Sequence, residues 1–302
     1  MSFSKTKLAT TLAITSLLAA CGSSDGGSSL SRSENTRVSV ALTDAAVDDV
    51  DAVNIVITGL TFQPDDGQRT TVELDEPLAV NLLELQNGTV RQLVNDQALT
   101  SGDYSWMRLQ LADESEFSVV DDGAQFALKV PSGQQNGLKT SGFTLPEGGE
   151  VSFTIDFDVR KSLVYRPGPG DYLLKPVLRL VEDEQSGTVT GTVDETLLAS
   201  ACENTTDFAG AVYFFEGADQ TPDDLGSDNE PEVVTPVDTE AYTFTAAFLD
   251  EGEYTVSYTC DRDTVEDDQE NPVDEDLTFF DTQTVSVTSG DTTTVTFEQT
   301  AP

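Results

Sequence analysis

The chain of 302 residues contains no histidine. Histidine is the side chain that most often serves as a general base and as a ligand of transition metals. Its absence excludes Ser-His-Asp and Cys-His catalytic sets, and it excludes zinc held by imidazole. The three cysteines do not have zinc-finger spacing either. We therefore predict that the protein is not an enzyme.

Basic residues are scarce. The chain has 15 Lys and Arg against 55 Asp and Glu, which gives a formal net charge of -40 at pH 7. Such a surface repels anionic lipid headgroups and also nucleic acid, so we expect no nucleic-acid partner. Salt makes this self-repulsion tolerable, because the Debye length falls from ~8 Å at 0.15 M to ~3 Å at 1 M. The composition therefore indicates either a marine or salt-tolerant host or a surface that gathers divalent cations.

The first of the three cysteines ends a short apolar segment. Lys5 and Lys7 precede residues 8–20, which are apolar and small. This run is shorter than the ~20 helical residues that span a bilayer. Cys21 follows two alanines and precedes a glycine, and this arrangement resembles the lipobox of bacterial lipoproteins. The resemblance implies that residues 1–20 are a cleaved signal peptide and that Cys21 carries the lipid. A secretory signal with a chance cysteine is the alternative.

If Cys21 carries lipid, Cys202 and Cys260 are left over. An even remainder in an exported chain indicates a Cys202–Cys260 disulfide, and the chain-entropy model gives such a loop roughly 4 kcal/mol. Two free thiols are the alternative. Residues 21–36 are rich in Gly and Ser and predict a flexible tether. Gly22 after the cysteine is compatible with sorting to the outer membrane, so we expect a lipid-anchored protein of the outer membrane or cell surface.

Short alternating runs separated by turn residues predict an all-β fold. In residues 151–159, apolar side chains alternate with Ser, Thr and Asp, which predicts a strand with one core face and one wet face. A polar stretch at 182–188 predicts a linker. We therefore expect two β-sandwich domains of Ig-like or prealbumin-like type, residues 37–182 and 187–300.

Three segments carry a family resemblance. Residues 172–181 (YLLKPVLRLV) are predicted as one closing strand, with Pro176 at an edge or bulge because proline donates no ladder hydrogen bond. Together with 38–45 (VSVALTDA) and 53–59 (VNIVITG), this segment resembles a family of bacterial lipoproteins that carry a β-rich domain of unknown function. The resemblance covers about residues 37–182 and implies an exported, lipid-anchored β protein. It carries over no catalytic residue.

A second, shorter pattern occurs once in each predicted domain. Gly102 and Gly252 each stand two residues before a tyrosine that begins a predicted strand. This Gly-x-Tyr pattern is similar to that of transthyretin-like and carboxypeptidase-regulatory-like sandwiches. The resemblance implies a carboxypeptidase-regulatory-like extension over residues 187–300.

Two acidic runs, at 216–240 and 261–276, are predicted as long loops of the second domain. Calcium takes six to eight oxygen ligands, and such loops can supply them. The candidate calcium ligands are Asp261, Asp263, Asp267 and Asp268. EF-hand spacing fails, since Val265 stands where the third ligand belongs. A solvated, salt-adapted loop is the preferred interpretation, and calcium is the one cofactor left open.

A third acidic group follows the first predicted strand. It consists of Asp44, Asp48, Asp49 and Asp51. Asp44 is predicted to cap a turn or short helix at 45–50, because aspartate accepts hydrogen bonds from the free amides at a helix start. A ligand role for this group is the alternative.

Two further positions are candidates for chemistry. Asp156 and Asp158 stand two apart on a predicted strand, a spacing of ~6.6–6.8 Å that overlaps the ~6.5–9.5 Å of inverting glycosidases. The preferred alternative is a solvated face on which Arg160 offsets their charge. Trp106 and Met107 are neighbours in another strand, so at most one faces the core. We expect Trp106 to be buried. An exposed tryptophan would instead indicate carbohydrate stacking.

These observations favour a non-catalytic, lipid-anchored binding or interaction protein of the cell envelope. Its partners would be the membrane, reached through the lipid, and a saccharide or protein ligand. A structural envelope spacer that binds nothing small is the first alternative. A carboxylate-based glycoside hydrolase that uses Asp156 and Asp158 is the second.

Overall fold

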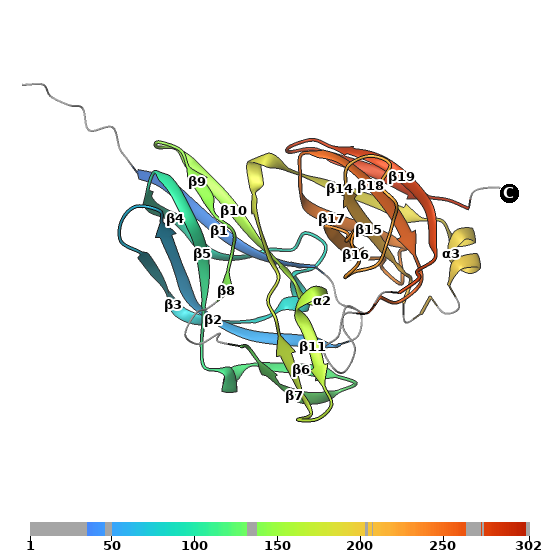
Figure 1. Ribbon diagram of the computed structural model, residues 1–302, viewed down its shortest axis with the longest axis horizontal. Coiled ribbons are helices and arrows are strands. Elements are labelled where there is room, and N and C mark those ends of the chain that lie inside the picture. Colours follow the sequence, from blue (N-terminus) through green and yellow to red (C-terminus); the bar gives the residue numbers. More distant parts are fainter. Residues whose placement is uncertain are drawn as a thin grey trace, which may run out of the picture. The chain divides into compact units, whose positions relative to one another are not determined.

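The computed structural model describes residues 35–45, 50–131, 138–202, 205–206, 208–263, 273 and 275–299 (Figure 1). Residues Ser33–Pro302 form one compact unit. The predicted signal peptide, Cys21 and most of the predicted tether lie outside the described residues.

The N-terminal half of the described chain (residues 35–185) folds into two sheets. Its strands are β1 (Asn35–Ala45), β2 (Ala52–Pro64), β3 (Thr70–Asn81), β4 (Arg91–Thr100), β5 (Gly102–Leu111), β6 (Ser118–Asp121), β7 (Ala124–Lys129), β8 (Leu138–Lys139), β9 (Phe143–Leu145), β10 (Glu150–Asp158), β11 (Leu163–Arg166), β12 (Asp171–Leu174) and β13 (Leu178–Glu182). Its helical turns are η1 (Leu82–Leu85), η2 (Glu114–Glu116), α2 (Val159–Ser162) and η3 (Asp183–Gln185). One sheet has the order β13–β10–β1–β4. The other has the order β11–β12–β7–β6–β2–β5–β8, with β3 paired to β2 and β9 to β5.

One hydrophobic core joins the two sheets of this half. Val40 and Ile155 come from the first sheet, and Ile57 and Leu109 come from the second, and all four are fully buried. Apolar residues that alternate along a strand point to one face, so each sheet presents its apolar face to the other. The N-terminal half is therefore a β-sandwich.

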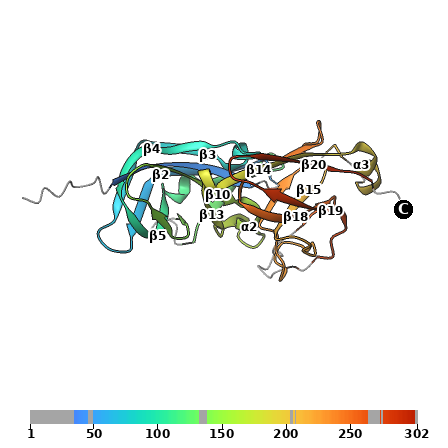
Figure 2. The ribbon, with the colours of Figure 1, turned by 90° about the horizontal axis from the view of Figure 1, so that it is seen from above.

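The C-terminal half (residues 186–299) repeats this plan with other strands. They are β14 (Ser186–Val193), β15 (Ala211–Glu216), β16 (Val233–Pro236), β17 (Thr243–Asp250), β18 (Gly252–Thr259), β19 (Phe279–Val287) and β20 (Thr292–Phe297), together with the helix α3 (Glu195–Ala201). The sheets have the orders β17–β14–β20 and β16–β15–β18–β19; Figure 2 shows β14 beside β20 and β15, β18 and β19 side by side. Their shared core includes Val189, Phe297, Phe214 and Val256. The prediction of an all-β fold is confirmed.

The outer face of the β15–β16 pair is also covered. Tyr213 and Phe215 point away from the shared core, yet they are buried beneath Leu225 and Phe279. The acidic run at 216–240 is therefore not the solvated loop that the sequence predicted. It contributes β16, and it folds an apolar leucine back onto the sheet.

Strand β10 corrects another prediction. Its side chains were expected to alternate between core and solvent, but Thr154, Asp156 and Arg160 are buried, and Arg160 lies in α2 instead of on the strand. The polar face of β10 faces protein: a small cavity beside Asp156 is lined on its other side by residues of β16 and β17. A wet strand face and a face covered by other strands carry the same alternation, so the sequence pattern cannot distinguish them.

The predicted single strand at 172–181 is in fact two. β12 pairs with β11 and β7 in the larger sheet, whereas β13 pairs with β10 in the other. The break falls at Lys175–Val177, around Pro176, where the chain crosses between the sheets. Proline donates no ladder hydrogen bond, so it interrupts the strand instead of lying at its edge.

The polar stretch at 182–188 is not an open linker. η3 occupies its centre, and Ser186 already begins β14. The strands before this stretch belong to the sheets of the N-terminal half, and the strands after it belong to the sheets of the C-terminal half. The division into two domains stays a prediction.

Candidate functional site

A β-bulge in β5 decides which side chains face outward. In the pairing with β2, Gln63 stands opposite Trp106 and Pro64 opposite Tyr104, so Ser105 is the extra residue of the bulge. A bulge resets the alternation of side chains. Tyr104 and Met107 therefore both lie in the core, while Trp106 is only half-buried on the outer face of the sheet. The expectation that Trp106 is buried is wrong.

Three cationic side chains lie over the indole ring of Trp106. The guanidinium carbons of Arg108 and Arg69 are 4.4 Å and 5.3 Å from the ring centroid, and Lys139 Nζ is 4.6 Å from it. Each distance is within the ~6 Å at which a cation is attracted to an aromatic face. We call Arg69, Trp106, Arg108 and Lys139 the Trp106 cluster.

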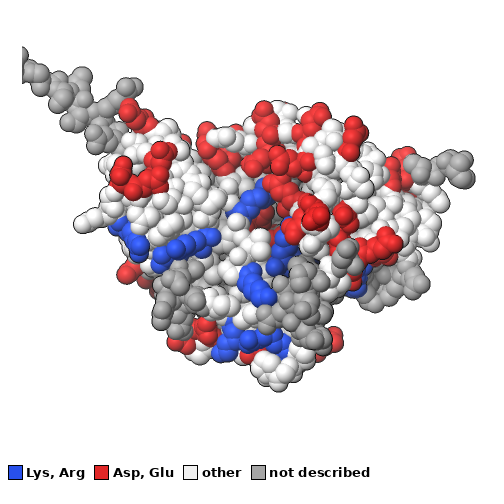
Figure 3. Space-filling view, in the orientation of Figure 1, with Lys and Arg blue, Asp and Glu red and all other residues white. Residues whose placement is uncertain are grey.

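The sheet pairing explains how these residues meet. Arg108 follows Trp106 by two positions on β5, so both point outward, and Lys139 of β8 is the direct partner of Arg108. Arg69 reaches the ring from the turn before β3, and its Nε donates to Gln63 Oε1 at 2.6 Å. Figure 3 shows Lys and Arg side chains gathered over the part of this face where β5 lies, beside a largely uncharged surface.

The cations of the Trp106 cluster lack acidic partners among the described residues. Every ion pair within the described ranges involves other basic residues. Arg108 makes no hydrogen bond there, and its buried Nε has no acceptor. Burial and the charge of Arg69 lower the pKa of Arg108. An uncompensated group of cations is unexpected in a chain with 55 acidic residues.

A row of hydrogen-bonded polar side chains continues the outer face beside the cluster. Gln110 Nε2 donates to Thr61 Oγ1 at 2.8 Å, and Thr61 Oγ1 is 3.2 Å from Thr71 Oγ1. These residues come from β5, β2 and β3, which are neighbours in the sheet. This part of the outer face therefore carries polar and cationic side chains, and Asp65 lies beside it, where its Oδ1 accepts from Ser105 Oγ.

The second group of charges is acidic and buried. Asp44 of β1 is 5% exposed; its Oδ1 accepts from the amide of Val159 at 3.3 Å, and its Oδ2 has no partner. Burial, together with the charges of Asp156 and Asp158, raises the pKa of Asp44 well above its ordinary value. The turn at 45–50 that Asp44 was predicted to cap lies mostly outside the described residues; in the described chain Asp44 lies in β1 and accepts from the start of α2, far away in sequence. Asp48 and Asp49 lie outside the described residues.

Asp156 and Asp158 do not form an open carboxylate pair. Asp156 Oδ2 is 2.9 Å from Arg179 Nη2, and Asp158 Oδ1 accepts from the amide of Lys161 at 3.0 Å. The cavity beside Asp44 and Asp156 has a volume of about 30 Å³, which accommodates water but no sugar ring. Burial also raises the pKa of Asp158. The geometry gives these carboxylates a structural role.

Arg179 joins Asp156 to the C-terminal half. Its Nη1 is 3.2 Å from Glu232 Oε1, beside β16. Nearby, Lys161 Nζ is 2.8 Å from Glu230 Oε2 and donates to the Pro231 carbonyl at 2.9 Å. Although burial opposes its charge, the carboxylates of Asp156 and Glu232 raise the pKa of Arg179.

The predicted calcium ligands do not gather among the described residues. Asp261 Oδ2 accepts from the amide of Thr278 at 2.7 Å. Asp263 is 7% exposed, and its Oδ2 accepts from Tyr213 Oη at 2.8 Å and from the Leu225 amide at 2.9 Å. Asp267 and Asp268 lie outside the described residues, and the described ranges contain no group of three acids, histidines or cysteines that could hold a metal.

Asp224 lies within the acidic run at 216–240, and nothing in the sequence predicted its burial. It is fully buried, its Oδ2 accepts from the Glu275 amide at 2.7 Å, and its Oδ1 has no partner. Asp263 Oδ1 is likewise buried without a partner. Burial raises the pKa of Asp263, and the charge of Asp224 adds to this effect. The two acidic runs thus each contribute one buried carboxylate with an unpartnered oxygen.

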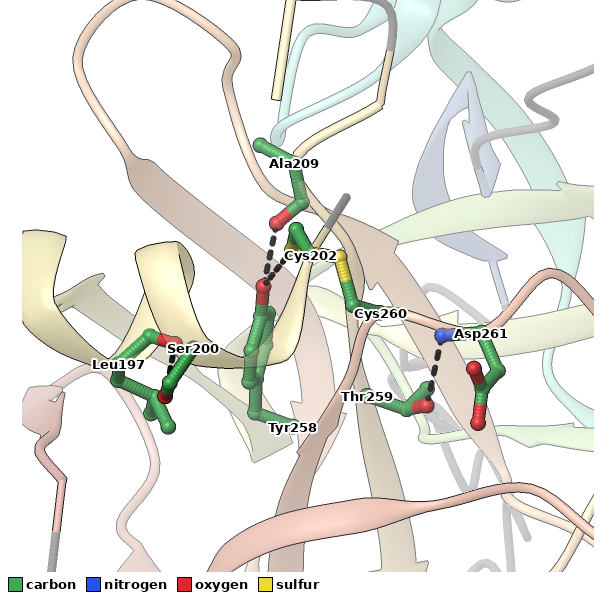
Figure 4. The surroundings of a disulfide bond; sticks show 8 residues. All are labelled: Leu197, Ser200, Cys202, Ala209, Tyr258, Thr259, Cys260 and Asp261. Carbon is green, nitrogen blue, oxygen red and sulfur yellow. Dashed lines mark hydrogen bonds between the residues drawn. A yellow bond between two sulfur atoms is a disulfide. The ribbon is translucent and has the colours of Figure 1, made fainter. Parts of the chain in front are cut away.

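Cys202 and Cys260 form a disulfide, as the sequence indicated. It joins the end of α3 to the end of β18, with a Cα–Cα distance of 5.4 Å (Figure 4). Tyr258 lies against it: the hydroxyl donates to the Ala209 carbonyl at 2.8 Å and is 3.1 Å from Cys202 Sγ. The bond therefore ties the helix to the sheet over a sequence separation of 58.

Residues 35–176 match a protein family described as "Domain of unknown function (DUF4382)". No curated protein matches the chain. In the described part of the chain, every helix falls short of the length and apolar character that a membrane crossing requires.

Several solved structures are similar to the chain at low identity. GBS52, the minor pilin of Streptococcus agalactiae, is 10% identical over 87% of this chain and 96% of that chain, with a TM-score of 0.23. BcpA, the major pilin subunit of Bacillus cereus, is 10% identical over 87% and 98%, with a TM-score of 0.21. The TIE protein of Bacillus anthracis is 11% identical over 88% of this chain, with a TM-score of 0.22. The chain spans only 34% of the TIE protein.

Proposed function

We propose that this chain is a non-catalytic binding protein, held outside the cytoplasm by a lipid on Cys21, and that the Trp106 cluster is its binding surface. The observation that carries the proposal is a group of cations without acidic partners in the described chain, on the outer face of a sheet. Arg37, Lys129, Lys161, Arg166 and Arg179 each pair with a carboxylate, whereas the cluster gathers three cations on one ring without such a pair. Cations left without a carboxylate partner are free to meet a ligand.

Location rests on other observations. The lysine-containing start, the short apolar run and the Ala-Ala-Cys-Gly junction support lipidation of Cys21 and sorting to the outer membrane or cell surface. The disulfide supports an oxidising compartment. A lipid would also supply the membrane affinity that an acidic surface opposes.

Mass spectrometry of the N-terminal peptide, after expression of the full chain in a Gram-negative host, tests the location. We expect the peptide to begin at an acylated Cys21, and we expect Cys21→Ser to release the protein from the membrane fraction. An intact leader, or an unmodified thiol at Cys21, would refute the anchor.

The single tryptophan of the chain provides the binding test. Because Trp106 lies within the proposed surface, a ligand bound there changes the fluorescence of the whole protein. We expect a saturable change with at least one member of a panel of neutral glycans, acidic glycans, calcium and envelope proteins. The structural-spacer alternative predicts that the emission is unaffected by every member, while chemical crosslinks to neighbouring proteins remain.

A further inference from the structure

We infer that the Trp106 cluster binds an acidic polysaccharide through its sulfate or carboxylate groups. This inference rests on the proposed function and names its ligand class. It combines three features of the cluster: the unpaired cations, the occupied indole face and the polar row beside them.

The cations of the Trp106 cluster repel one another. Arg69, Arg108 and Lys139 share one aromatic ring, and like charges at this separation repel each other, which is why Arg69 contributes to the lowered pKa of Arg108. The face of the indole offsets part of this repulsion. A bound anion would offset the remaining repulsion between the cations. Arginine presents a planar fork of donors that matches carboxylate and sulfate oxygens.

The face of the indole ring is covered by these cations. Carbohydrate-binding tryptophans offer a bare face to the sugar, but the cationic groups here lie over the ring, at 4.4 Å to 5.3 Å from its centroid. Trp106 therefore positions the cations instead of stacking on the ligand. This arrangement favours the charged substituents of a sugar over its apolar face, so a neutral glycan is a poor fit.

The polar side chains beside the cluster indicate the chemistry of the rest of the ligand. Gln110 of β5 and Thr71 of β3 lie beside the cluster, where they can meet sugar hydroxyls, and the buried Thr61 of β2 holds them together through its hydroxyl. Duplex nucleic acid places a charge every ~1.7 Å, and a protein of charge -40 repels so dense a polyanion. A polysaccharide is a flexible single chain, so it can present a few acidic groups to the cluster without placing a continuous row of charge along the acidic surface. Acidic residues farther from the cluster than the ~8 Å Debye length are largely screened at physiological salt, so they oppose binding only weakly.

The test compares dextran sulfate with unsulfated dextran of the same length, titrated against the chain from residue 22 onward. Fluorescence of Trp106 and calorimetry both report binding. We expect dextran sulfate to bind and dextran not to bind. Arg108→Gln and Lys139→Gln should each weaken binding about tenfold, which corresponds to about 1.4 kcal/mol. Arg108→Lys should fall between, because it keeps the charge and loses the fork.

Arg91→Gln is the matched control. Arg91 is an exposed arginine of β4, in the other sheet, and its substitution removes the same charge. We expect its binding to stay within twofold of the wild type. If Arg91→Gln weakens binding as much as Arg108→Gln, the attraction is diffuse and the inference is wrong. Melting temperatures of all variants separate lost binding from lost folding.

The outcomes distinguish this inference from the proposed function. If neutral dextran binds as well as dextran sulfate, or if only anionic vesicles bind through Arg108 and Lys139, the Trp106 cluster still binds a ligand, but not an acidic polysaccharide. If no member of the broader panel changes the Trp106 fluorescence, both proposals fail together.

Discussion

Arginines occur in two contrasting settings in this molecule. Arg179 lies between Asp156 and Glu232, with N–O distances of 2.9 Å and 3.2 Å, and its charge is fully matched. Arg108 lies against Trp106 and Lys139, with no acidic partner among the described residues. Both are partly withdrawn from water. One arginine thus holds strands together through two ion pairs, and the other has no acidic partner in the described chain, which is the basis for the proposed ligand site.

Buried acids extend the comparison. Asp44, Asp224 and Asp263 each have a carboxylate oxygen without a partner. An unmatched buried charge costs more than a matched one, because water no longer solvates it. The unmatched groups are therefore the positions where a substitution can stabilise the fold, and the matched groups are the positions where it destabilises the fold.

The largest effect is expected at Arg179. Arg179→Met leaves Asp156 and Glu232 without their cation, and we expect it to lower the free energy of unfolding by about 3–5 kcal/mol. Urea unfolding measures this change. Arg37→Gln, which breaks an exposed pair with Asp96, is the control and should cost about 1 kcal/mol or less. If the two variants lose the same amount, the buried pairing of Arg179 is unimportant.

Asp44→Asn should act in the opposite direction. The amide keeps an acceptor for Val159 N and removes repulsion from Asp156 and Asp158. We expect a gain of about 1–3 kcal/mol near pH 7, the range set by a buried polar group without a partner.

The pH dependence of this gain has a definite sign. Because the pKa of Asp44 is raised in the folded state, the folded protein holds this proton more tightly than the unfolded chain does. The free energy of unfolding therefore falls as pH rises from the ordinary carboxyl range upward. Asp44→Asn should remove that fall, so its advantage should shrink at acidic pH. An advantage that is constant with pH would show that Asp44 is not the titrating group.

Calcium should have a smaller effect. If the unpartnered oxygens of Asp224 and Asp263 take part in a calcium site, an ion at several times its Kd stabilises the fold by about 1 kcal/mol. Thermal unfolding with calcium and with chelator measures the shift. Asp263→Asn should abolish it and Asp261→Asn, at an exposed carboxylate, should retain it. An unchanged melting temperature of the wild type would leave these carboxylates with a purely structural role.

The smallest effect on stability is expected at Arg108. Its substitution by Gln removes a cation–π contact, worth about 0.5–1 kcal/mol at a partly exposed site, and relieves repulsion from Arg69. The net change in unfolding free energy should stay below about 1 kcal/mol. A loss comparable to that of Arg179→Met would place Arg108 among the residues that hold the fold together.

The sequence predicted the strands better than their surroundings. Alternation and turn residues located β10 and β18, because side chains in a strand have a strict period of two. Burial of the polar face of β10 was not predictable, since it depends on strands far away in sequence. Pro176 marked a disturbance of the strand, but only the pairing shows that the chain changes sheets there.

The candidate site was mostly missed for the same reason. A one-residue bulge at Ser105 turns Trp106 outward, and bulges leave little trace in a single sequence. Arg69 and Lys139 reach the ring from separate turns and strands, which no local pattern connects. The alternation of Trp106 and Arg108 with Met107 and Leu109 was the one available signal. By contrast, the Cys202–Cys260 pair followed from counting the cysteines that remain in an exported chain once Cys21 is assigned to the lipid.

The most direct test of this account measures Arg108→Gln and Arg179→Gln side by side, for dextran sulfate binding and for urea unfolding. The account predicts that Arg108→Gln loses about tenfold in affinity with nearly unchanged stability, whereas Arg179→Gln loses stability and, while folded, keeps its affinity. Wild-type affinity in Arg108→Gln would contradict the claim that its unpaired charge serves a ligand.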